Sequence, residues 1–403
     1  MNLLNNLKNI VFVLLAFTIP VSVAFTNVFL VVFLIVWLLE GDFIRKIHVF
    51  KSNKWLWSVL VLTIMYFLGL MYGHNHNDAN YVLQRVSLLL MFIVFTTAEI
   101  RQKSYHYALT LFLFTNLISA TVSILINNEI IEPISSYIPI ISSENSISAF
   151  LKYNYHNILL SFSSLLSFIL FHLSKNKYSF LYLLAIPIFC LSIFSEAGRA
   201  GQLTINVFMF FYAIYFLRSK IKYSISIFFF LILVNYSSYN NSTVFKYRVD
   251  QLNHVVQNNG EKKNPKAKEK DIRYLFLNES LSLIKERPFF GHGSGSFSSI
   301  LISNTNSSYD FEKHKTPHNN FLYVFFELGI FGFLIFLSIF YYQIKSILKN
   351  SNMKIHSIIL PLFYLFLMLF DSYLFIFTIT VMYMFMYKIF SEIDLKFKKR
   401  LLK

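Results

Sequence analysis

The sequence has very little cysteine and little charge, and both shortages limit what the protein can be. A single cysteine, Cys190, lies within an apolar run, so neither an internal disulfide nor a cysteine-based metal site is expected. Only 14% of the 403 residues are charged and 56% are hydrophobic, with a mean hydropathy of +0.54. This composition is too apolar for a soluble domain of this size. It predicts a membrane protein and argues against a nucleic-acid partner.

Two further patterns are missing. The glycine-rich segment from Gly291 to Gly295 lacks the Gly-Lys-Ser/Thr ending of a phosphate-binding loop, so nucleotide binding is not supported. The two halves of the chain show no internal repeat, although transporters are typically built from two related halves.

Long apolar runs with polar breaks predict an all-α protein with about twelve transmembrane helices, since a span needs about 20 apolar residues. The first two runs form one long stretch that must break near Pro20 to Asn27 for both to cross, and a signal peptide would lack the second of them. The expected spans are residues 8–24, 26–40, 55–73, 79–97, 107–127, 156–173, 178–195, 201–217, 223–237, 319–341, 356–371 and 373–390.

Lysine and arginine predict the orientation. Twenty-one of them lie in segments that are inside if the N-terminus is cytoplasmic, and only Lys152 and Arg199 lie in the short outer segments. Both termini are therefore expected in the cytoplasm. The expected parts are residues 1–236 with nine helices, an outer loop over 237–318, and 319–403 with three helices and a basic tail. Within the loop, residues 258–270 are predicted to be solvated, and Asp271 to Glu286 to form a helix.

Arginines on the predicted outer side are candidates for binding an anion. A tight turn exposes Arg199 between small residues, and a guanidinium can hold two phosphate oxygens. The alternative for Arg199 is a pairing with Glu196 or with lipid phosphate. Arg273 and Arg287 lie in the loop helix and just after it, beside glycines that would let backbone amides approach an anion. A solvated loop is the alternative there.

His318 and Asn319 directly precede the tenth expected span. Histidine can accept a proton near neutral pH, and a helix N-terminus favours an anion beside it. Alternatively, one of the two residues caps the helix while Gly329 and Gly332 admit a neighbouring helix. Glu327 is expected to face the helix bundle, because an unpaired carboxylate in lipid is costly.

Arg85 and His156 are further candidates at the outer ends of spans four and six. Arg85 would either snorkel outward or reach the same cavity as the other arginines. His74 and His76 are too exposed and too few to indicate a metal. We expect neither a metal nor another cofactor.

Together these segments resemble the O-antigen ligase and O-antigen polymerase superfamily of membrane glycosyltransferases. The resemblance spans most of the chain and implies a GT-C-like, all-α protein of the bacterial inner membrane with a large periplasmic loop between helices nine and ten. The most specific part is His318-Asn319 followed by nine residues and Gly329-x-x-Gly332, which is similar to the ligase signature. The other matching segments are Gly198-Arg199-Ala200 and Arg273 through Arg287-Pro288-Phe289-Phe290-Gly291-His292-Gly293.

The resemblance implies transfer of a glycan from undecaprenyl diphosphate to a sugar hydroxyl at the periplasmic face, without nucleotide or metal. The diphosphate is a good leaving group, so the enzyme has mainly to neutralise its charge and activate the hydroxyl. On this hypothesis the catalytic residues are His318, Arg199 and Arg273, and the substrate-binding residues are Arg85, Arg287, Asn319 and His156.

The acceptor remains open between two members of the superfamily. A ligase transfers to lipid A-core in lipopolysaccharide biosynthesis, and a polymerase transfers to another carrier-linked repeat unit. The net charge of +16 favours lipid A-core slightly, because a phosphorylated core is anionic. A flippase for the lipid-linked glycan is the alternative from another class, and a structural or receptor role is a further one. Membrane lipids are the other expected partners.

Overall fold

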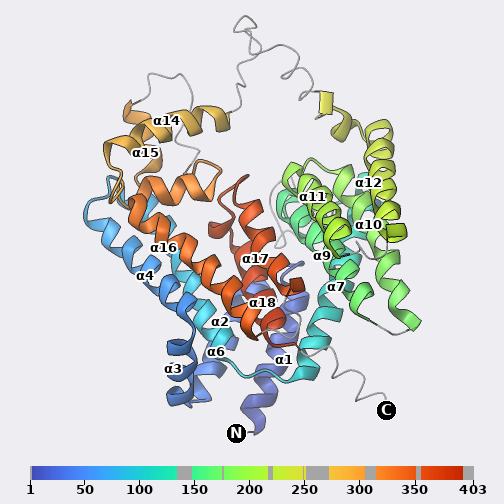
Figure 1. Ribbon diagram of the computed structural model, residues 1–403, viewed down its shortest axis with the longest axis horizontal. Helices are drawn as coiled ribbons and strands as arrows, with labels where there is room; N and C mark the ends of the chain where they lie inside the picture. The colour runs from blue at the N-terminus through green and yellow to red at the C-terminus, as the bar shows by residue number, and fades with distance from the viewer. Residues whose placement is uncertain are drawn as a thin grey trace, which may run out of the picture. The chain divides into compact units, whose positions relative to one another are not determined.

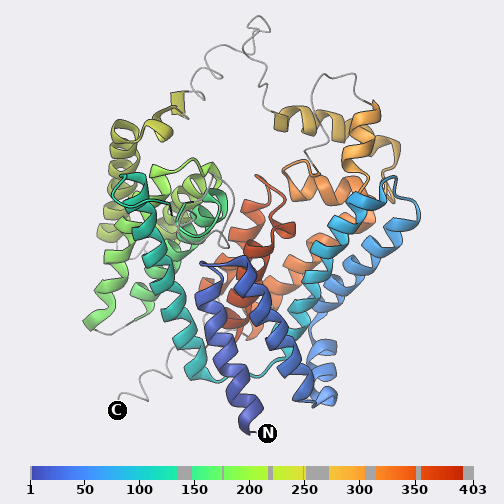
Figure 2. The same cartoon turned by 180° about the vertical axis from the view of Figure 1, so that it is seen from behind.

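The computed structural model describes residues 2–133, 148–174, 177–216, 221–247, 249–250, 272–304, 315–350 and 355–393. These residues form helices and connecting segments without a β-strand, which confirms the all-α fold class (Figure 1; Figure 2 from behind). The chain divides into two compact units. Unit 1 comprises Met1–Asn5, Leu34–Ile100 and Pro265–Asp394, and unit 2 comprises Asn6–Phe33, Arg101–Asn264 and Leu395–Lys403.

Unit 1 is organised around the long helix α16 (Asn320–Asn350), which packs along α4 (Lys54–Leu68) and against α17 (Ile355–Leu367). Aromatic rings fill this core, and the rings of Tyr364 and Tyr383 stack with centroids 4.2 Å apart. The other helices of the unit are α3 (Phe43–Ser52), α5 (His76–Ser87), α6 (Met91–Thr97), α14 (Ile272–Glu286), α15 (Phe297–Asn304) and α18 (Phe377–Glu392), with 3₁₀ turns η1 (Gly69–Met71), η2 (Leu88–Leu90) and η5 (Tyr373–Phe375).

Unit 2 is organised around α9 (Tyr153–Leu173), which α7 (Gln102–Asn127), α10 (Phe180–Ser195) and α11 (Arg199–Phe216) surround. Its serines at positions 161, 163, 164 and 167 are fully buried, because small side chains let neighbouring helices approach closely. Helix α12 (Ile221–Asn241) packs on α11. Helices α1 (Asn2–Thr18) and α2 (Val23–Leu39) each contribute residues to both units.

Each expected span coincides with helical segments, but the count of twelve spans is not confirmed. Among the described residues, five helices are both long and apolar enough to cross a membrane, or six if the bent pair Val23–Leu39 and Phe43–Ser52 is one span. Three further apolar helices are shorter: Leu3–Thr18, Phe180–Ser195 and His356–Leu367. The protein therefore has several membrane-spanning helices, and their number stays a prediction.

Helices α3 and α15 of the described part of the chain were not predicted from the sequence. The expected span 79–97 is interrupted, since η2 separates α5 from α6. The loop helix is confirmed from Ile272 onward, while Asp271 and the low-complexity residues 258–270 lie outside the described part of the chain.

Candidate functional site

The imidazole of His318 lies beside a carboxylate that the sequence analysis did not single out. His318 Nδ1 is 2.9 Å from Oδ1 of Asp371, and the same oxygen accepts a hydrogen bond of 2.7 Å from the amide of Ser372. The ring also stacks on Phe276 of α14 at a centroid distance of 6.1 Å. His318 and Asp371 remain partly exposed, at 29% and 20%. A histidine held by a carboxylate and open to solvent is suited to accept a proton.

The backbone at His318 is in the left-handed region, with a φ of 53°. This conformation is uncommon for a residue other than glycine and costs about 1–3 kcal/mol unless the surroundings hold it. The next residue, Asn319, caps α16, because its Oδ1 accepts the amide of Leu322 at 3.0 Å and its Nδ2 donates to the carbonyl of Leu369 at 3.2 Å. Asn319 is thus the residue that caps the helix, as one of the two alternatives proposed. A contact of Asn319 with substrate stays a prediction.

Two cations flank the ring of Tyr81 near the segments that carry this histidine and carboxylate. The guanidinium of Arg85 lies 4.8 Å and the ammonium of Lys315 4.9 Å from the ring centroid. Arg85 also donates to the carbonyl of Phe375 at 2.6 Å, and Lys315 pairs with Asp78 at 3.2 Å. Phe375 follows Asp371 by four residues and Lys315 precedes His318 by three. Positive charge is therefore fixed close in sequence to both members of the His318–Asp371 pair.

Arg287 lies at a different place in unit 1. It lines a cavity of about 330 Å³ between the end of α14 and α15. The cavity is lined by His74, Glu286, Arg287, His292, Ser299, Ile300 and Ser303.

The backbone of Arg273 lies in α14, three residues before Phe276, but its side chain lies outside the described part of the chain.

The glycine-rich turn does not offer its amides to an anion, so that prediction is wrong. The amides of His292 and Gly293 donate to the carbonyls of Phe326 and Glu327, each at 2.9 Å. The amide of Ser294 donates to the carbonyl of Gly69 at 3.1 Å, and that of Gly295 to the Glu327 carboxylate at 2.7 Å. Residues 291–298 are buried, which also overturns the alternative of a solvated loop.

The turn docks into a break in α16. Gly329 has a φ of 63°, which interrupts the helix. The backbone carbonyls of Phe326 and Glu327, just before the interruption, accept hydrogen bonds from amides of the docked loop. A Cβ on Gly329 would lie 2.3 Å from the carbonyl carbon and oxygen of Phe289, so a loop crosses here and not the neighbouring helix that was one alternative. Glu327 is fully buried, as predicted, and its carboxylate holds the turn.

The buried imidazole of His292 predicts that this docking depends on pH. Its Nε2 lies 2.9 Å from the Leu283 carbonyl, and burial lowers the pKa of His292 below its usual 6.5. Because the folded-state pKa is the lower one, the stabilisation is complete above about pH 6.5 and is lost as the pH falls through the folded-state pKa. We expect amides 291–295 to lose hydrogen-exchange protection, corrected for intrinsic rates, as the pH falls below 6.5.

A His292→Gln variant is the control for this pH effect, because its amide can donate to the same carbonyl but does not titrate. Protection in this variant should not change with pH over the same range. Equal pH dependence in the variant and in the natural protein would contradict the role of His292.

In unit 2, Arg199 begins α11 directly after a turn that α9 holds in place. His156 Nδ1 lies 3.3 Å from the Glu196 carboxylate, which also accepts from the hydroxyl of Ser123. A Cβ on either Gly198 or Gly201 would meet Asn157 of α9 at less than 3 Å. The Glu196 carboxylate contacts Ser123 and His156, and the Arg199 side chain is exposed.

His156 is 1% exposed, so in this structure it contacts Glu196 and not an open surface. Its predicted contact with substrate stays a prediction. The geometry instead supports a positioning role, in which His156 holds the turn that presents Arg199.

Asp371 and Lys315 are the polar residues that sequence reasoning missed. Asp371 is an acidic residue at the boundary between two expected spans. An acidic residue beside an apolar span is costly and marks a candidate functional position, so the sequence did contain a signal for it. Lys315 lies in a polar stretch rich in other charged residues, and nothing in its neighbours marks it out.

Comparison with known proteins gives one family match. Residues 157–337 match the family model described as O-antigen ligase. The matched segment contains Arg199, Arg273, Arg287, His318 and Asn319. A search of curated proteins found no match.

Proposed function

We propose that the chain, whose residues 157–337 match the O-antigen ligase family model, is a membrane glycosyltransferase of the ligase type. Its donor is a glycan on undecaprenyl diphosphate, and its acceptor is a sugar hydroxyl of lipid A-core at the periplasmic face, as a step of lipopolysaccharide biosynthesis. The observation that carries this proposal is the pairing of His318 with Asp371 at the start of α16.

The reaction needs a base at the acceptor and positive charge at the leaving group. A bond forms between the acceptor oxygen and the anomeric carbon of the donor, while the bond from that carbon to the diphosphate breaks. The hydroxyl proton goes to Nε2 of His318, and the lipid diphosphate leaves with the electron pair. Asp371 holds the proton on Nδ1, which places the basic lone pair on Nε2 and stabilises the imidazolium that forms.

Arg85 and Lys315 supply positive charge for the leaving diphosphate on this proposal. They are fixed around Tyr81 and tied to the segments of His318 and Asp371. Fixed cations stabilise developing negative charge better than mobile ones, because they need no reorganisation during the reaction. The proposal gives Arg199 and Arg273 the same role, positive charge for the leaving diphosphate, on the basis of the family resemblance.

The function is tested with the full-length chain purified in detergent, supplied with a labelled glycan on undecaprenyl diphosphate and with lipid A-core. We expect the label on lipid A-core and release of undecaprenyl diphosphate. Lengthened glycan on the carrier would instead indicate a polymerase. Absence of transfer to either acceptor, with movement of the donor across reconstituted vesicles, would indicate a flippase.

Replacing one of the proposed cations should slow this transfer. Arg199→Ala and Lys315→Ala are each expected to cost about 2.7–4 kcal/mol of transition-state stabilisation, a loss of about 10²–10³-fold in rate. The control is Lys349→Ala, which removes an exposed cation from the last turn of α16, the end opposite to His318. Transfer that survives Arg199→Ala unchanged would refute the role of Arg199.

A further inference from the structure

A sharp corner joins α2 to α3 in a part of the molecule that the proposed reaction does not use. Helix α2 ends at Leu39, and α3, Phe43–Ser52, leaves at an angle of 112°. The two residues before α3, Gly41 and Asp42, have positive φ values of 68° and 50°. With ten residues, α3 is about 15 Å long and cannot cross a membrane by itself.

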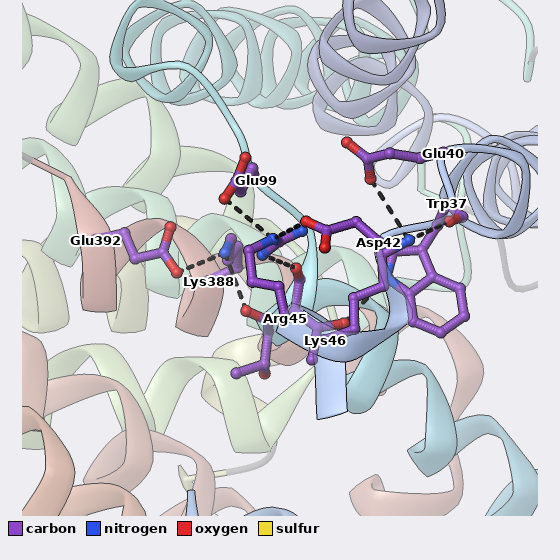
Figure 3. Close-up of polar contacts among 10 residues, drawn as sticks. Trp37, Glu40, Asp42, Arg45, Lys46, Glu99, Lys388 and Glu392 are labelled. Carbon is purple, nitrogen blue, oxygen red and sulfur yellow. Dashed lines mark hydrogen bonds and ion pairs between the residues drawn. The ribbon is translucent and has the colours of Figure 1, made fainter. Parts of the chain in front are cut away.

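Charged side chains make several contacts at the corner between α2 and α3 (Figure 3). Arg45 binds Asp42 at 2.7 Å and Glu99 at 3.2 Å. The ammonium of Lys46 donates to the Trp37 carbonyl at 2.5 Å and lies 3.6 Å from Glu40. Lys46 is only 3% exposed, so this cation is held inside the protein. The direction of α3 is therefore set by several contacts and not by the loop alone.

The corner lies at the ends of membrane-spanning helices. The span Asp78–Thr97 ends here, since Arg45 donates to the Thr97 carbonyl at 3.1 Å and Trp37 to the Thr97 hydroxyl at 3.0 Å. The span Lys54–Met71 begins two residues after α3. At the other end of this span, the carbonyl of Gly69 accepts a hydrogen bond from the amide of Ser294 in the glycine-rich turn. Helix α3 thus lies at the membrane boundary opposite to that turn.

The outer side of α3 exposes three apolar residues next to the polar His48. Phe43, Ile44 and Ile47 are 49%, 87% and 51% exposed, although the two cations Arg45 and Lys46 turn toward the protein. A soluble surface helix would have the opposite arrangement. Lys51 follows Ile47 by four residues and so projects from the same side of the helix. The segment 42–54 contains four Lys and Arg residues and one acidic residue.

We propose that α3 lies in the membrane interface and binds anionic phospholipid. Phe43, Ile44 and Ile47 enter the boundary of the acyl chains, where an in-plane amphipathic helix buries its apolar side. Lys51 extends from that side to a headgroup phosphate, as long basic side chains do at membrane boundaries. The partner is a lipid surface, because the exposed apolar stripe is joined directly to the spans and a basic charge excess accompanies it.

The depth of α3 is tested with a nitroxide spin label in the full chain reconstituted in vesicles. In a Cys190→Ala background, Ile44→Cys and Ser52→Cys receive the label. Cys190 is buried, and Ser52 is exposed and lies about 140° around the helix axis from Ile47 and about 80° from Ile44. We expect the label at position 44 to collide more with oxygen and that at position 52 with a water-soluble nickel complex. A label at 44 that prefers the nickel complex, or that neither reagent reaches, would overturn the proposal.

The headgroup preference is tested by native mass spectrometry of protein extracted from bilayers that contain equal phosphatidylglycerol and phosphatidylcholine. We expect Lys51→Gln to lower the retained ratio of phosphatidylglycerol to phosphatidylcholine about fivefold, whereas Lys51→Arg retains it. Lys349→Gln, at the end of another helix, serves as the control for loss of one exposed cation. An unchanged ratio in Lys51→Gln, or the same loss in Lys349→Gln, would refute a lipid site at α3.

Discussion

Replacing His318 with asparagine is expected to slow glycan transfer by about 10²–10⁴-fold. The imidazole is the group placed to take the proton of the acceptor hydroxyl, and an amide cannot take its place as a base. Asparagine is the appropriate replacement because it adopts positive φ more readily than most residues, and His318 has a φ of 53°. The rate is measured with the labelled donor and lipid A-core in detergent.

Alanine at the same position would mix two effects, since it removes the imidazole and also strains the left-handed backbone. Comparing His318→Asn with His318→Ala separates them, because both variants should lose transfer but only the second should lose thermal stability. Transfer by His318→Asn at more than a tenth of the natural rate would exclude His318 as the base.

Asp371 is expected to act only through His318. Asp371→Asn should slow transfer, because the amide no longer favours the tautomer with a proton on Nδ1. The double variant should be no slower than His318→Asn alone, since two residues that act as one unit are not additive. An additive loss in the double variant would assign Asp371 a separate contact with substrate.

The second large effect concerns folding. Gly329→Ala is expected to lower the free energy of unfolding by about 2–4 kcal/mol, because it adds backbone strain at positive φ to a collision with the crossing loop. The new Cβ would lie 2.3 Å from backbone atoms of Phe289, which cannot rotate away as a side chain can. Thermal unfolding in detergent measures the loss, and hydrogen exchange at residues 291–295 should increase with it.

Gly41→Ala is the matched control for this variant. Gly41 has a φ of 68°, but a Cβ there would meet nothing within 4 Å. Its replacement therefore measures the backbone strain alone, which is about 1–2 kcal/mol. Equal destabilisation by the two variants would show that the loop yields and that close packing at Gly329 matters little.

The sequence pattern located His318 and Gly329 but assigned the glycine a different neighbour. A sequence motif gives residue types and their spacing, but it does not identify the segment of the chain that packs against a glycine. The structure places the Phe289–Phe290 backbone there, and the amides of the glycine-rich turn bond to helix carbonyls and to Glu327. The turn is a docking element, although its composition resembled that of an anion-binding loop.

Helix α3 was missed for a related reason. Its apolar residues are too few for a span and its charges suit a loop, so a search for long apolar runs passes over it. The helix is held by contacts such as that of Arg45 with the Thr97 carbonyl, two groups that are 52 residues apart in the chain.

Local composition was sufficient for the membrane class, the positions of most helices and the candidacy of His318, because apolar runs and helix caps act over a few neighbouring residues. The partners of the polar groups were not accessible in this way. Asp371 meets His318 across 53 residues, and Arg85 meets the Phe375 carbonyl across 290. Such contacts form because buried polar groups must find partners wherever packing brings them, and packing is a property of the folded chain.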